Sequence, residues 1–185
     1  MPIPQEFTQA TDWKSLDIAV HSFGKSNSWT EDDLLMALNA IKSWRKRFAD
    51  KFVFEFQGEQ IFWGRYESLV WALGEQFHQV LSKNKPLRKS GRFFEAVQAI
   101  CFEKKFGKGR ESFTMLLGQY GGASQIPALI RLLDDPQVSG HAIYSLRLLG
   151  AAEAADKVRP FLDESKAWVK QEARKFFQKI EPKKK

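Results

Sequence analysis

The amino-acid sequence predicts an all-α protein, an α-solenoid of stacked helical hairpins. Three observations predict this fold class. Residues 116–145 and 148–180 resemble each other, apolar residues recur at helical spacing, and 43% of the 185 residues are hydrophobic. A repeated unit of about 30 residues cannot bury its own apolar face, so neighbouring copies must stack on one another.

Matched positions in the two copies share residue character as well as spacing. Each copy opens with Leu-Leu-Gly, at residues 116–118 and 148–150. The acidic turn at residues 132–135 matches residues 161–164 at an offset of 29, and positions after the turn match at an offset of 31. Each copy is therefore predicted to be a helix, a short acidic turn and a second helix. The expected helices cover residues 126–133 and 138–149 in the first copy, and 155–162 and 169–180 in the second.

At these residues the chain resembles the HEAT-like repeats first associated with phycobilisome lyases, over residues 116–180. Units of that family read Leu-Gly, a small residue, an apolar helix, Leu-x-Asp, then Val-Arg and an alanine-rich second helix. The chain departs from this pattern because Ser139 follows Val138 and Lys170 follows Val169. The arginine that pairs with the acidic turn is thus absent or replaced. The resemblance implies a solenoid whose second helices line a concave surface, and it implies little about function.

Upstream of the repeats the sequence predicts a diverged, aromatic-rich helical lobe. Five of the six tryptophans precede the repeats, and prolines with a Gly-Lys-Ser-Asn-Ser cluster mark the N-terminal segment as an arm with one short helix near residues 13–20. We expect one structural domain overall. Its parts are an N-terminal arm at 1–29, a helical lobe at 30–115, two HEAT-like repeats at 116–181 and a basic tail at 182–185.

Three helices are predicted within the lobe, and one segment has two interpretations. Thr30 followed by Asp33 resembles a capping box that starts a helix over residues 31–50. Apolar stripes predict further helices at residues 67–81 and 93–102. Residues 51–63 alternate like strands around Gly58, which is consistent with a β-hairpin. We favour helix interrupted at Gly58, and the hairpin is the alternative.

Positive charge is concentrated in one short region. The chain has 29 Lys and Arg against 22 Asp and Glu, and residues 83–110 carry the whole net charge of +7. Arg88, Lys89 and Arg92 lie beside a predicted helix cap at Ser90, where cations oppose the helix dipole, so we expect an anion site there. Solvated charge on a connecting loop is the alternative interpretation. The candidate anion- or nucleic-acid-binding residues are Lys83, Lys85, Arg88, Lys89, Arg92, Lys104, Lys105, Lys108 and Arg110, with Phe93, Phe94, Phe102 and Phe106 as candidate stacking groups.

The second helices of the repeats offer a different surface. Mixed charge and a tyrosine favour recognition of a protein over tracking of phosphates. The alternative is that these side chains are only the polar face of amphipathic helices. The predicted protein-binding concave face consists of His141, Tyr144, Arg147, Lys170 and Arg174.

Residues suited to catalysis or metal binding are sparse. The three histidines, His21, His78 and His141, are dispersed, and the single cysteine, Cys101, lies in an apolar stripe that predicts a buried, inert thiol. We therefore expect no catalytic residues, no metal and no cofactor. One cysteine, no cleavable signal sequence and no apolar run near 18 residues predict a cytoplasmic protein without a membrane partner.

These observations predict a non-catalytic protein that binds another macromolecule. The expected partner is a protein with an acidic surface, as for an adaptor or an immunity-type protein. Binding of nucleic acid through residues 83–110 is the alternative from another class. A bilin lyase-like chaperone is a second alternative, and it is implied only by the resemblance to the repeat family.

Overall fold

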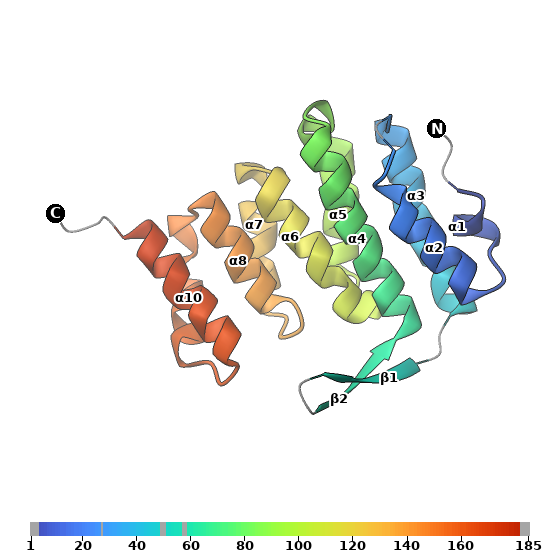
Figure 1. The fold of residues 1–185 in the computed structure, drawn as a ribbon. Helices are drawn as coiled ribbons and strands as arrows, with labels where there is room; N and C mark the ends of the chain where they lie inside the picture. Colours follow the sequence, from blue (N-terminus) through green and yellow to red (C-terminus); the bar gives the residue numbers. More distant parts are fainter. Residues whose placement is uncertain (1–3, 27, 49–50, 57–58, 182–185) are drawn as a thin grey trace.

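The computed structural model describes residues 4–26, 28–48, 51–56 and 59–181, which form helices and one two-stranded ribbon (Figure 1). The α-helices are α1 Glu6–Gln9, α2 Trp13–Phe23, α3 Glu31–Arg47, α4 Arg65–Lys83, α5 Gly91–Phe102, α6 Arg110–Tyr120, α7 Ile126–Leu132, α8 Ser139–Leu149, α9 Ala155–Val158 and α10 Ala167–Ile180. The strands are β1 Lys51–Phe56 and β2 Glu59–Gly64. The 3₁₀ helices are η1 Pro86–Lys89, η2 Lys104–Gly109, η3 Ala123–Gln125, η4 Ala152–Ala154 and η5 Arg159–Asp163.

The helices pack in two layers. In the first, α4 lies between α2 and α6, and α8 lies between α6 and α10. In the second, α5 packs against α3 and α7. Contacts of α5 with α6, α7 with α8 and η5 with α10 join the two layers. Helices adjacent in sequence therefore pair across the layers, and alternate helices lie side by side within them.

Aromatic residues of the N-terminal half fill the core. Phe7 stacks on Phe23 at 5.5 Å between ring centroids, Phe23 meets Phe77 at 5.5 Å, and Phe77 meets Phe93 at 5.4 Å. All four rings are at most 1% exposed. The segment expected to be a surface arm instead contributes α1 and α2 to this core. Burial of Phe7, Phe23 and their apolar neighbours removes a large apolar surface from water and so stabilises this arrangement.

Capping side chains begin α3 and α5 where the sequence predicted. Thr30 Oγ1 accepts a hydrogen bond from the Asp33 amide at 3.2 Å, and the Thr30 amide donates to Asp33 Oδ2 at 2.9 Å. Ser90 Oγ accepts from the Phe93 amide at 3.0 Å. The α3 helix ends at Arg47, short of the expected residue 50, and residues 49 and 50 lie outside the described part.

The favoured helical interpretation of residues 51–63 is wrong. β1 and β2 pair in antiparallel fashion, with Lys51 opposite Gly64 and Phe56 opposite Glu59. Residues 51–56 are rich in Phe and Val. These residue types favour the pleated backbone of a strand over a helix. The strand pair leads directly into the first turn of α4 (Figure 1).

The two Leu-Leu-Gly sequences occupy different structural positions. Gly118 lies within α6, facing Ser145 of α8, and a Cβ there would be 2.3 Å from the Ser145 Cβ. Gly150 instead ends α8 with a left-handed φ of 65°. The 3₁₀ turns η3 and η4 begin at residues 123 and 152, an offset of 29, so Gly150 corresponds to Gly121. The sequence comparison matched Gly150 with Gly118, at an offset of 32 residues. That alignment of the two copies is therefore wrong by three residues, about one helical turn.

The first helix of the second copy is shorter than expected. Residues 155–162 were predicted to be helical, but α9 ends at Val158 and continues as η5. Pro160 has no amide hydrogen to donate back along an α-helix, which favours the change to 3₁₀ geometry. Phe161 and Leu162 still pack against the core from η5. The predicted tail at 182–185 lies outside the described residues.

Candidate binding surfaces

The nine candidate basic residues do not form one surface. Helix α5 separates the five that lie near its N-terminus from the four near its C-terminus. Its 12 residues extend over about 18 Å at 1.5 Å per residue. Lys83, Lys85 and Lys89 are exposed at the first end, and Lys104 and Lys108 are exposed at the other.

Two arginines near the start of α5 have partners within the chain. Arg88 donates to the Leu81 and Ser82 carbonyl oxygens at 2.6 and 2.7 Å, and its guanidinium lies 5.1 Å from the centroid of the Tyr120 ring. It thus satisfies carbonyl groups near the C-terminus of α4. Arg92 pairs with Glu31 Oε2 at 3.1 Å. Although both cations oppose the helix dipole, each is stabilised by partners within the chain.

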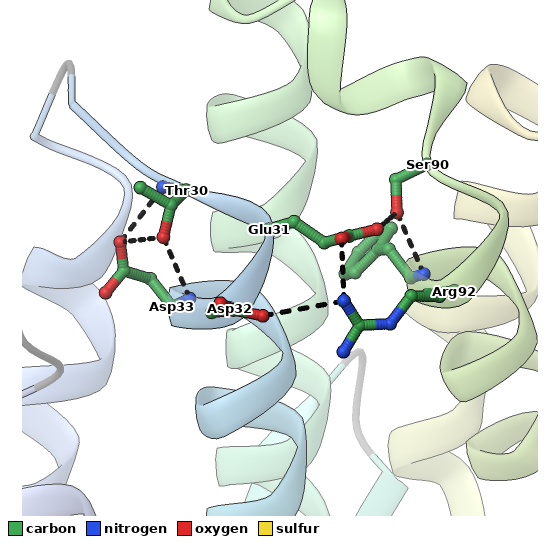
Figure 2. A network of polar contacts seen from close by, with 7 residues as sticks. Thr30, Glu31, Asp32, Asp33, Ser90 and Arg92 are labelled. Carbon is green, nitrogen blue, oxygen red and sulfur yellow. Dashed lines mark hydrogen bonds and ion pairs between the residues drawn. The ribbon is translucent and has the colours of Figure 1, made fainter.

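A carboxylate of the chain itself occupies the N-terminus of α5. Glu31 Oε1 accepts a hydrogen bond from the Ser90 hydroxyl, and Glu31 Oε2 faces Arg92 (Figure 2). Asp32 Oδ1 also approaches Arg92, at 3.7 Å. The serine, the arginine and the helix start thus serve to join α3 to α5. The position predicted to bind an external anion is filled by Glu31.

Arg110 is not a surface residue. Its side chain is 0% exposed, and it donates to the Cys101 and Gly107 carbonyl oxygens at 3.0 Å each, to Asp135 Oδ2 at 2.7 Å and to Gln137 Oε1 at 2.6 Å. Burial raises the pKa of Asp135, but hydrogen bonds from Arg110 and the Gln137 amide outweigh burial and leave that pKa below its usual value. Arg110 therefore joins α6 to the turn after α7, and it is unavailable to a partner.

The phenylalanines considered as stacking groups belong mainly to the core. Phe93, Phe94 and Phe106 are at most 3% exposed. Phe102 is half-buried, and the Arg131 guanidinium lies 4.6 Å from its ring centroid. Stacking of nucleic-acid bases requires an accessible aromatic face, which the three buried rings do not offer.

The predicted protein-binding residues on α8 lie together on an open face. His141, Tyr144 and Leu148 follow one another at spacings of three and four residues, so they share one side of the helix. Leu148 is 40% exposed, and Trp168, across on α10, is 46% exposed. We name this surface the α8–α10 face. Its residues are His141, Tyr144, Arg147, Leu148, Trp168, Glu172 and Lys175.

Ion pairs hold the side chains of the α8–α10 face. Arg147 contacts Glu172 Oε2 through Nε and Nη2, both at 3.0 Å, and its guanidinium lies 5.1 Å from the Tyr144 ring centroid. Glu172 Oε1 accepts from Lys175 Nζ at 2.7 Å. Because Glu172 is only 12% exposed, this pairing is well shielded from solvent. Tyr144 and Arg147 are therefore held in position by contacts within the chain.

Lys170 and Arg174 do not join this face. Each lies two residues from a face residue, Trp168 or Glu172, which places it about 200° around α10. The residues of the predicted concave face therefore do not share one surface, because those on α10 lie on the side away from Trp168 and Glu172. We exclude Lys170 and Arg174 from the α8–α10 face.

A half-buried pair of titratable groups lies at one end of this face. His141 Nε2 is 4.0 Å from Glu111 Oε2, and the His141 ring lies 4.9 Å from that of Trp168. Burial lowers the pKa of His141 to about 4, and His141 Nδ1 has no hydrogen-bond partner. Burial also raises the pKa of Glu111 to about 7, despite the nearby charge of Lys108. Histidine is therefore neutral at pH 7, and the contact is not a fixed ion pair.

Sequence reasoning missed Leu148, Trp168 and Glu111 as members of a possible site. Leu148 lies four residues after Tyr144 and outside the buried stripe of α8, which marks an exposed apolar residue. Trp168 likewise precedes the buried stripe that begins at Val169. Glu111 gives no sequence signal, because its burial depends on how α6 meets α8.

The remaining expectations from the sequence concern the cysteine, metal binding and the membrane. Cys101 is fully buried, as predicted, and burial raises the pKa of its thiol to about 12, which disfavours the reactive thiolate. Within residues 4–26, 28–48, 51–56 and 59–181, no group of three His, Cys, Asp or Glu side chains is placed to hold a metal ion. No helix in that part of the chain is long and apolar enough to cross a membrane. Neither the models of known protein families nor the curated proteins include a match to this chain.

Proposed function

We propose that the chain is a non-catalytic protein-binding scaffold of HEAT-like helical hairpins, an α-solenoid, and that its partner binds the α8–α10 face. The paired helices and the offset of 29 between η3 and η4 support the repeat interpretation. The resemblance of residues 116–180 to HEAT-like repeats supports it as well. An adaptor or immunity-type role is consistent with a surface that binds without reacting.

The observation that carries this proposal is the pair of exposed apolar side chains beside a positioned Tyr and Arg. Leu148 and Trp168 are 40% and 46% exposed; Leu148 lies one helical turn after Tyr144, and the Trp168 ring contacts His141, one turn before Tyr144. Arg147 lies over the Tyr144 ring and pairs with Glu172. Trp, Tyr and Arg dominate binding energy at protein interfaces, and side chains that are already ordered lose less entropy on binding. The net charge of +7 supports a partner with an acidic surface.

The test compares two surface variants of the full chain. Leu148→Ser with Trp168→Ser should abolish co-purification of a specific partner, and Ile18→Ser should retain it. Ile18 is 59% exposed on α2, so the control also replaces an exposed apolar residue. The Ile18 control should unfold within about 0.5 kcal/mol of the natural chain, since substitutions of exposed residues have small effects on stability. The double variant should still unfold cooperatively, although it loses the contact of the Trp168 ring with His141. Equal recovery of the same proteins by both variants would contradict the proposal.

The same experiment distinguishes the alternatives. Loss of the co-purifying proteins after nuclease treatment would favour nucleic-acid binding. Their loss in a Lys85→Glu and Lys89→Glu variant would place that binding at the exposed lysines near α5. That binding should also fall steeply as salt rises, because phosphate contacts release counterions. Visible absorbance after mixing with a bilin pigment would favour the chaperone alternative.

A further inference from the structure

An open groove lies between α3 and α5, in the layer that does not contain α8 and α10. Its volume is about 750 Å³. Leu35, Met36 and Ala96 provide its apolar surface, and Asp32, Arg92 and Glu95 provide polar groups along it. We name it the α3–α5 groove. None of its residues belongs to the α8–α10 face.

The apolar part of the groove is accessible. Met36 is 44% exposed, and Leu35 and Ala96 are half-buried beside it. Methionine has a flexible, polarisable side chain that adapts to the shape of an apolar partner. An exposed methionine between two half-buried apolar residues is therefore suited to a side chain inserted from outside.

The charge along the groove opposes that of the whole chain. Arg92 is the cation of the groove, and Glu31 and Asp32 both contact it (Figure 2). The side chain of Asp32 is 77% exposed, and Glu95 is exposed as well. Carboxylates thus outnumber the single guanidinium on a protein whose net charge is +7. A partner that fits this charge is basic.

The dimensions of the groove fit a short helix. Along α3 the lining runs from Asp32 to Asn39, and the seven steps between them span about 10 Å. About two turns of a docked helix cover that distance, and they place apolar side chains at positions i, i+3 or i+4, and i+7. Leu35 and Met36 of α3 face Ala96 of α5 at the centre of this span.

We propose that the α3–α5 groove binds an amphipathic helix of a partner protein, with an apolar face and with lysine or arginine along its edges. The apolar residues of that helix contact Met36 and Leu35. Its basic residues face Asp32 and Glu95. This partner helix differs in charge from the acidic partner of the α8–α10 face, so the two surfaces select different proteins.

Two synthetic peptides test this proposal with the full chain. Both have about 15 residues and the same leucine face, and one has lysine at every polar position where the other has glutamate. Fluorescence anisotropy measures their affinities. The lysine peptide should bind at least about tenfold more tightly. Because the net charge of +7 attracts the glutamate peptide non-specifically, a preference for lysine reports the groove.

Matched variants assign the binding to this groove. Met36→Lys should weaken the lysine peptide by about tenfold or more, and Ile18→Lys, at another exposed apolar residue, should leave its affinity unchanged. Asp32→Asn with Glu95→Gln should remove the preference between the two peptides.

Three results would overturn the proposal. They are equal binding of the two peptides, equal effects of the Met36 and Ile18 variants, and self-association of the chain that Met36→Lys abolishes. The last result would identify a second copy of this chain as the occupant. None of these results bears on the α8–α10 face, because its variants lie in the other layer.

Discussion

Replacement of Arg110 by methionine should strongly destabilise the fold. The guanidinium is fully buried and donates hydrogen bonds to Asp135, Gln137 and two carbonyl oxygens. Methionine fills similar space but donates nothing, so it leaves the Asp135 carboxylate only 14% exposed without its cation. Removal of one partner from a buried ion pair costs about 3–5 kcal/mol. The total stability of most domains is only about 5–15 kcal/mol.

Urea denaturation measures this loss, and a double-mutant cycle assigns it. Arg110→Met should lower the midpoint by about 2 M urea for a typical dependence on denaturant. Asp135→Asn alone should also be destabilising, because it leaves a buried cation without a carboxylate. The double variant should lose less than the sum of the two, by about 2 kcal/mol. Arg131→Met is the control, since Arg131 is exposed and stacks on Phe102.

The dependence on pH provides a second check. The pKa of Asp135 is held below its usual value, so its contribution to stability is present above that usual value and is lost as pH falls through the lowered one. In Arg110→Met this contribution is absent, so the difference between the variant and the natural chain should shrink in acid. Additive single effects, or a loss from Arg110→Met no larger than that from Arg131→Met, would refute the reasoning.

Three other substitutions, and one control for the third, have defined outcomes. Thr30→Ala removes the capping box of α3 and should cost about 1 kcal/mol in urea denaturation; an unchanged midpoint would contradict that role. Glu111→Gln should stabilise by about 1–3 kcal/mol at pH 8 but not at pH 5, because a pKa raised to about 7 makes stability fall as pH rises from 4.5 to 7. The same gain at both pH values would argue against it. Gly118→Ala should cost about 1–3 kcal/mol because its Cβ would lie 2.4 Å from the Ser145 Cα. Gly91→Ala, with open space at its Cβ, should not lower the measured stability.

The helices could be predicted from local patterns, whereas their exact register could not. Thr30, Asp33 and Ser90 mark helix starts through short-range hydrogen bonds, so their meaning is visible in the sequence. Gly118 and Gly150 share a local sequence but differ in structure. Position 118 requires glycine because α8 packs closely against it, and position 150 favours glycine because its backbone is left-handed. The sequence alone does not distinguish these two roles, because the role of Gly118 depends on how α6 packs on α8.

The candidate sites were predicted less well, for a related physical reason. A sequence shows that a residue is charged, but the partner that neutralises it is often distant in the chain. Glu31 lies 61 residues from Arg92, and Asp135 lies 25 residues from Arg110. Both ion pairs form only after the helices meet. Tyr144 and Arg147 were found because they share one helix, where the spacing alone places them together.

The division of charge within the chain favours a role in joining two partners. Arg88, Arg92 and Arg110, which accounted for part of the predicted anion surface, act within the fold. The net positive charge then rests more on exposed lysines near the two ends of α5, and positive charge of this kind attracts any acidic surface without specifying one. Specificity must come from shaped apolar surfaces, and the α8–α10 face and the α3–α5 groove are two such surfaces of different charge. Since they lie in different layers, a partner at one does not cover the other. If both proposals hold, one copy of this protein holds an acidic protein and a basic helix at the same time.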